Sequence, residues 1–180
     1  DTTDAAIIDV GASNIETFME NMEKTKGSHE DIDFYFIPTS PKPKQQKDTI
    51  RTVDNLIELG VEKDKIKLIF NFYDPDYPIE DLYSIIFENN IAKDLNLNNS
   101  NNVFTLNDNP VFDIIGEIGD SFLDIANDNS DYKSMIRASK DKAQRSALSN
   151  KRSAQRLAKG FIEELDATYN KIARNCELFE

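Results

Sequence analysis

The chain has 180 residues, of which 39% are hydrophobic and 30% charged, and this suits one domain with a helical appendage. Its net charge of −12 argues against general attraction to DNA or to an anionic membrane. A single cysteine excludes an internal disulfide and fits a reducing cytoplasm, and one histidine is too few for a zinc site. No apolar run approaches the about 20 residues that span a bilayer, so we expect a cytoplasmic protein without membrane contact.

Three apolar segments predict buried β-strands, at residues 5–10, 32–37 and 66–70. Two of them are nearly continuous apolar runs rather than clean alternations. That pattern is typical of strands covered on both faces, as in a parallel sheet.

Helical patterns lie between these strands. Ser13 and Glu16 have the spacing of a capping box, and the helix that follows should end near Gly27. A second helix is predicted over residues 46–59, and Gly60 ends it. Because helices connect successive strands, the sequence predicts an α/β fold with right-handed crossovers and a mostly parallel, doubly wound sheet.

The second half of the chain reads as mostly helical. We expect a helix over residues 79–95, an asparagine-rich loop, a fourth strand at 103–106 and a loop at 107–110. From Pro110 onward the pattern is helical with a break near 126–130, and a long apolar stripe marks the last helix. We therefore predict an α/β domain over 1–126 and a helical extension over 127–180.

Polar residues follow two of the predicted strands. Asp9 would end the first strand, where α/β sheets bind ligands and where a carboxylate can hold Mg²⁺ through water. Gly11 would let the backbone approach a phosphate. Asn71 would end the third strand, where an amide can pair with a purine edge. The alternatives are an aspartate that caps a turn and an asparagine that closes an Asx turn.

The loop at residues 38–46 is rich in proline, lysine and glutamine. Its basic and amide side chains could face a ligand or a partner subunit. An ordinary rigid connection from strand to helix explains the same composition equally well.

In order and spacing, these motifs resemble the ParA/MinD superfamily of deviant-Walker ATPases, and most of all the StbB-like plasmid stability proteins. The resemblance extends over residues 5–72 and is looser over the helical tail. The matching segments are residues 8–14, 27–31, 37–39, 45–46, 48–50 and 70–71.

This resemblance implies a P-loop NTPase-like fold that uses ATP and Mg²⁺. Asp9 would be the switch residue near Mg²⁺, which it holds through water, and Gly11 would lie by the γ-phosphate. Asn71 would read the adenine, with Pro110 packed near the base. The family acts as ATP-dependent homodimers, with DNA-binding adaptor proteins, in plasmid stability and partition or in positioning DNA during conjugation.

The sequence departs from the family in two places. Gly11 comes one residue earlier than in the Asp-x-x-Gly switch of many relatives. Nothing matches the phosphate-binding Gly-x-x-x-x-Gly-Lys-[Ser/Thr] loop, which the family places before the strand that carries Asp9. We therefore expect this chain alone to be inactive in ATP hydrolysis, and we favour a loop lost or omitted upstream over a degenerate relative.

Basic residues are concentrated in an otherwise acidic chain. Residues 132–160 carry nine basic residues and one acid, a net charge of +8, so the remainder carries −20. Non-specific DNA contact through phosphate neutralisation is one interpretation. A solvated helix face, or packing against the protein's own acidic surface, is another. The basic residues are Lys133, Arg137, Lys140, Lys142, Arg145, Lys151, Arg152, Arg156 and Lys159.

Two functions are consistent with these features. The first is an ATPase switch, which an upstream glycine-rich loop in the gene would support. The second is a non-enzymatic module that contacts protein or DNA and has a degenerate nucleotide site. A response-regulator receiver is set aside, because Asp9 has no acidic residue immediately before it.

Overall fold

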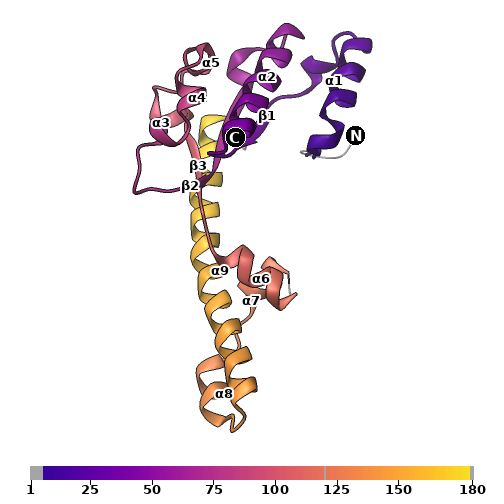
Figure 1. The fold of residues 1–180 in the computed structure, drawn as a ribbon. Helices are drawn as coiled ribbons and strands as arrows, with labels where there is room; N and C mark the ends of the chain where they lie inside the picture. Colours follow the sequence, from indigo (N-terminus) through magenta and orange to yellow (C-terminus); the bar gives the residue numbers. More distant parts are fainter. Residues whose placement is uncertain (1–5, 120, 179–180) are drawn as a thin grey trace. The chain divides into compact units, whose positions relative to one another are not determined.

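The protein has an α/β fold with a parallel three-stranded sheet and a long carboxyl-terminal helix (Figure 1). The structure, a computed structural model, describes residues 6–119 and 121–178. The sheet has the order β1-β2-β3. Its strands are β1 (Tyr35–Thr39), β2 (Ile66–Tyr73) and β3 (Phe104–Asn107).

The helices fall into a group of short to medium elements and one very long one. The α-helices are α1 (Ile15–Lys24), α2 (Pro43–Glu58), α3 (Ile79–Leu82), α4 (Ser84–Phe87), α5 (Asn90–Asp94), α6 (Val111–Ile118), α7 (Phe122–Asn127), α8 (Tyr132–Ala138) and α9 (Lys142–Asn175). Short 3₁₀ turns are η1 (Ala12–Asn14), η2 (Ser28–Asp31), η3 (Lys63–Lys65) and η4 (Ser100–Asn102).

The chain packs into two compact units. The first comprises residues 1–69 and 83–102, and the second comprises residues 70–82 and 103–180. Strand β2 contributes its first half to one unit and its second half to the other. This is a different division from the predicted one at 126/127, which stays a prediction.

The first unit is built on α2, which packs against β1, α4 and α5. Its fully buried side chains include Val53 and Leu56 on α2, Leu68 on β2, and Ile86 and Ile91 on the short helices. Val53 and Leu56 are three residues apart, so they share the helix face that is turned to the core. Burying such aliphatic side chains contributes about 1.5–3 kcal/mol each.

The strands predicted at 32–37, 66–70 and 103–106 are present as β1, β2 and β3, with shifted bounds. β1 begins three residues later and ends two residues later than predicted, β2 extends three residues further, and β3 lies one residue later. In β2, buried Ile66, Leu68 and Phe70 alternate with half-buried residues. One face of the strand is therefore fully covered and the other only partly. This alternation corrects the expectation of a strand that is buried on both faces.

The strand predicted at 5–10 is wrong for the part that the structure describes. Residues 6–10 form neither strand nor helix, and the Ile7 and Ile8 side chains are 96% and 68% exposed. A strand requires hydrogen bonds to a neighbouring segment, and a short apolar run does not specify that neighbour. Ala5 lies outside the described residues.

The predicted capping box is also wrong. Ser13 lies inside η1, and Asn14 is the N-cap of α1 without a side-chain hydrogen bond to the helix. The helix itself is confirmed. The backbone after it takes a positive φ of 85° at Gly27, and Gly60 after α2 has a φ of 99°, as expected of glycines that follow helices.

The single helix predicted over 79–95 is replaced by α3, α4 and α5. Asn89 causes the last interruption, because its backbone is extended and its Oδ1 accepts a hydrogen bond from Ile91 N at 3.1 Å. Asparagine offers the backbone such local bonds in competition with a continuous helix.

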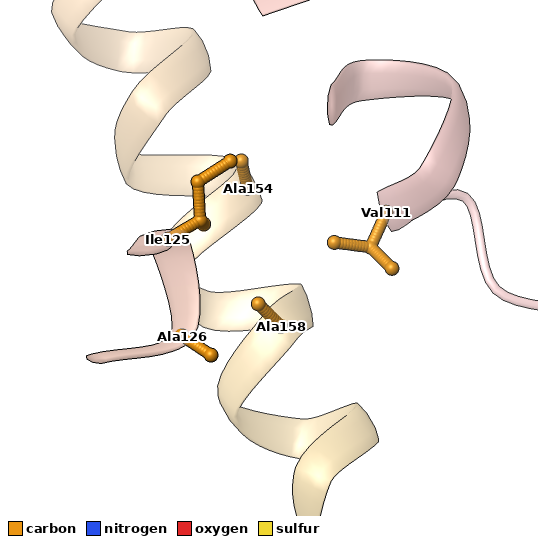
Figure 2. Packing of buried hydrophobic residues seen from close by; sticks show 5 residues of the cluster. All are labelled: Val111, Ile125, Ala126, Ala154 and Ala158. Atoms are coloured by element: carbon orange, nitrogen blue, oxygen red, sulfur yellow. The ribbon is translucent and has the colours of Figure 1, made fainter. Parts of the chain in front are cut away.

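In the second unit, α6, α7 and α8 pack along α9, the orange-to-yellow helix of Figure 1. Figure 2 shows the apolar cluster between them, which consists of Val111 on α6, Ile125 and Ala126 on α7, and Ala154 and Ala158 on α9. Both α9 alanines are fully buried. Because their side chains are single methyl groups, the backbones of the three helices can approach closely. Cys176, the C-cap residue of α9, is buried.

None of the helices in the described part of the chain combines the length and the apolar character of a membrane span.

Asp128 anchors the turn between α7 and α8, and it supplies a pH prediction. Hydrogen bonds from the Ser130 and Tyr132 side chains and from Ser130 N–H lower the pKa of Asp128 to about 2. These bonds stabilise the ionised form. Their contribution is therefore complete above the ordinary aspartate pKa, and it is lost as the pH falls through about 2.

We expect the Asp128 carboxyl signal in NMR to titrate near pH 2, and the pKa of Asp128 to rise in the Tyr132→Phe variant. An unchanged pKa in that variant would show that the Tyr132 hydroxyl does not hold the carboxylate.

Candidate nucleotide and nucleic-acid sites

The carboxyl ends of β2 and β3 bring two of the predicted site residues to one edge of the sheet. Asn71 lies near the end of β2, and Pro110 is the N-cap of α6 directly after β3. Asp108 N donates to Tyr73 O at 2.9 Å, which ties the loop after β3 to the end of β2. Ligands of parallel α/β sheets bind outside the carboxyl ends of the strands, so this edge is the candidate nucleotide site.

Asn71 is half-buried, and its Oδ1 accepts a hydrogen bond from Phe72 N at 3.0 Å. The Asx turn that the alternative interpretation assigned to Asn71 is made by Asp74, whose Oδ1 accepts from Asp76 N at 3.0 Å. Asn109 Oδ1 similarly accepts from Val111 N at 3.0 Å and so begins α6. Local bonds thus fix the backbone on both sides of the edge.

Phe72 is the unusual residue at this end of the sheet, and it was not among the site residues predicted from the sequence. Its φ is +62°, a left-handed conformation that costs an L-residue about 1–2 kcal/mol. Phe72 is 53% exposed, and Tyr77, five residues later, is 56% exposed. The only signal in the sequence was an aromatic residue directly after Asn71.

Side chains of α9 hold the outer backbone of β3. Glu164 accepts from Asn107 N, Thr168 Oγ1 donates to Thr105 O at 2.9 Å, and Lys171 Nζ donates to Val103 O. Lys171 Nζ also lies 5.6 Å from the centroid of the Phe104 ring. The backbone N–H and C=O groups of residues 103, 105 and 107 point to the same side of the strand, away from β2. β3 is the outermost strand of the sheet, so these groups have no neighbouring strand, and side chains of α9 bond to them instead.

Glu164 is half-buried, and its hydrogen bond fixes Asn107, the last residue of β3, from which the chain continues to Pro110. Burial lowers the pKa of the Lys171 ammonium group in the same region.

Asp9 and Gly11 belong to the first unit, whereas Asn71 and Pro110 belong to the second. Asp9 is exposed in a segment without strand structure, so it does not end a buried strand as expected. Gly11 has φ −60° and ψ 148°, and a Cβ added there would meet nothing within 4 Å. Neither the backbone angles nor the space around Gly11 requires a glycine at this position. The catalytic and Mg²⁺-binding roles of these two residues stay predictions.

Within residues 6–119 and 121–178, no group of three or more histidine, cysteine or acidic side chains has an arrangement that could hold a metal ion. A Mg²⁺ ion held mainly by nucleotide phosphates and water needs only one or two carboxylates from the protein. Asp9 would be such a ligand.

The basic segment forms α8 and the first half of α9. Lys133, Arg137 and Lys140 are exposed, as are Lys142, Arg145, Arg156 and Lys159, while Lys151 and Arg152 are half-buried. The ion pairs that the structure gives are Lys24–Glu20 and Lys63–Asp94, both in the first unit. Among the described residues, Arg145, Arg152 and Arg156 have no ion-pair partner.

Three arginines share one face of α9, which we call the arginine face. Arg145, Arg152 and Arg156 are seven and four residues apart, which is helical spacing. The buried Ala154 and Ala158 lie on nearly the opposite side, because each residue turns the helix by about 100°. The arginine face is about 17 Å long at 1.5 Å per residue. It can therefore contact phosphates while the alanine side of α9 stays packed.

No family model, curated protein or solved structure matches this chain in the comparisons.

Proposed function

We propose that the chain belongs to a cytoplasmic ParA/MinD-like, P-loop NTPase-like domain with a doubly wound sheet. In this proposal, ATP binding switches a homodimer that acts in plasmid stability and partition or in DNA positioning during conjugation. One observation carries the proposal. The Asp108–Tyr73 bond holds together the carboxyl ends of two adjacent parallel strands, and these ends present Asn71 and Pro110.

In the proposed site, the Asn71 amide pairs with the adenine edge and the loop that ends at Pro110 packs near the base. For Asp9 and Gly11, which belong to the first unit, the resemblance supports separate roles: Asp9 would hold Mg²⁺ through water, and Gly11 would lie by the γ-phosphate. The phosphate-binding loop would come from residues other than these. Catalysis would then consist of positioning water and neutralising phosphate charge.

The arginine face supports a DNA-contacting role for the same protein. Its arginines are positioned along one helix side, and they lack ion-pair partners among the described residues. Lys133, Arg137, Lys140 and Lys151 would extend the contact. Binding through phosphates alone has no sequence preference. This fits a protein that binds DNA non-specifically and that has a DNA-binding adaptor protein as a second partner.

The second candidate is an interaction module that contacts DNA or protein and has a degenerate nucleotide site. The arginine face favours it, because those residues need no nucleotide to meet a phosphate backbone. ATP binding distinguishes the two candidates, whereas DNA binding is common to both.

The deciding experiment measures ATP affinity by calorimetry on the protein expressed from its complete gene. We expect binding in the presence of Mg²⁺, weakened about tenfold by Asn71→Ala, since a hydrogen-bond pair to a ligand contributes about 1–1.5 kcal/mol. The matched control is Asn99→Ala. Asn99 is an exposed asparagine of the first unit whose Oδ1 also accepts a backbone N–H, from Asn101 at 3.1 Å.

The control variant should bind ATP like the parent protein. Absence of ATP binding by the complete protein would reject the switch and leave the interaction module. Equal affinities of the parent and the Asn71→Ala variant would remove Asn71 from the base site.

A further inference from the structure

Phe72 combines a strained backbone conformation with an exposed aromatic side chain. Phe72 has a φ of +62° within β2, and the residue is 53% exposed. Bulky residues rarely adopt this conformation, for which glycine or asparagine is preferred. A residue held in such a conformation is a reason to look for a function at that position.

Packing does not explain Phe72. The neighbouring Phe70 is fully buried and supplies the core contact of this part of β2, whereas Phe72 is turned outward. An exposed phenylalanine gains little from folding. The conformation and the exposure together present a flat apolar ring at the carboxyl end of the central strand.

The surroundings of Phe72 match a base rather than another part of a nucleotide. Asn71 precedes it, and its Oδ1 accepts from Phe72 N at 3.0 Å, so the amide and the ring are fixed to the same peptide. After β2, the Tyr73 hydroxyl donates to Tyr77 O at 3.3 Å and so restrains the following turn. An amide with hydrogen-bonding groups beside an aromatic face is complementary to a purine, which has polar edges and a flat π-surface.

We propose that Phe72 is the base-stacking residue of the nucleotide site. This inference rests on the proposed function, because it specifies how that site holds the base. Asn71 reads the edge of the purine and Phe72 covers one of its faces. The left-handed backbone at residue 72 turns the ring outward while β2 continues its pairing.

The test uses three variants of Phe72 in the protein expressed from its complete gene. Phe72→Gly removes the ring and suits the positive φ, Phe72→Leu keeps apolar bulk without a flat face, and Phe72→Tyr keeps the stacking surface. Calorimetry with ATP, and with inorganic tripolyphosphate as a probe that has no base, separates base binding from phosphate binding. Thermal unfolding reports whether each variant is folded.

We expect Phe72→Gly and Phe72→Leu to weaken ATP binding about tenfold, and Phe72→Tyr to change it by less than about twofold. Tripolyphosphate affinity should be equal in all four proteins. Phe72→Gly should unfold at the same temperature as the parent or at a higher one, because glycine relieves the left-handed strain. A loss of binding in a variant that is at least as stable cannot be attributed to misfolding.

Unchanged ATP affinity in Phe72→Gly and Phe72→Leu, with Asn71→Ala still weakening it, would overturn the stacking role and leave the proposed function intact. A parallel loss of tripolyphosphate affinity in Phe72→Leu would overturn it as well, because the effect would then concern the phosphates. Absence of ATP binding by the parent protein would overturn both the proposed function and this inference.

Discussion

Replacing Phe104 by alanine will lower the free energy of unfolding by about 3–5 kcal/mol. Phe104 begins β3 and is fully buried. The substitution removes its apolar surface, leaves a cavity in a packed region, and deletes the ring beneath Lys171 Nζ, which lies 5.6 Å from its centroid. Denaturant unfolding followed by circular dichroism measures the loss. In a thermal scan it corresponds to a fall in Tm of about 10 °C.

Phe36→Ala is the matched control, because Phe36 is also a strand phenylalanine but is 38% exposed. It should cost about 1 kcal/mol, since less apolar surface returns to water. Equal losses in the two variants would show that the ring of Phe104 is no better buried in solution than that of Phe36.

Two helices, α2 and α9, could be predicted from the sequence for a physical reason. A helix makes its hydrogen bonds within a few residues, so the pattern that forms α2 and the long stripe of α9 is local. A strand pairs with a distant segment. The apolar run at 6–10 looks like β2 in composition, yet only β2 has neighbouring strands on both sides.

The candidate nucleotide edge was predictable only in part. A polar residue after an apolar strand indicated Asn71, and the resemblance to the ParA/MinD superfamily implied the loop to Pro110. Phe72 and Glu164 were missed. The importance of Phe72 depends on its positive φ, and that of Glu164 depends on a hydrogen bond to Asn107, 57 residues away. The periodicity of apolar residues along the sequence indicates neither a single backbone angle nor a contact between distant residues.

One helix connects the two proposed activities. α9 carries the arginine face in its first half, and in its second half it carries Glu164, Thr168 and Lys171, which hold β3. The loop from β3 leads to the candidate nucleotide edge.

Neutralising the arginine face should have the largest effect on DNA binding. The variant Arg145→Gln, Arg152→Gln, Arg156→Gln removes three positive charges from one side of α9 and keeps good helix formers at each position. Each phosphate contact contributes about a factor of ten in affinity at about 0.1 M salt. We therefore expect duplex DNA binding, measured by fluorescence anisotropy, to weaken by about two to three orders of magnitude.

The salt dependence provides the more specific readout. The slope of log K against log salt should become shallower by about three, because about 0.9 counterions are released per phosphate contact. The matched control, Lys26→Gln, Lys47→Gln, Arg51→Gln, makes the same change in net charge with exposed residues of the first unit. If the control loses as much affinity as the α9 variant, DNA responds to the overall charge and not to the arginine face. If only the α9 variant loses affinity and its slope falls, DNA phosphates lie along α9.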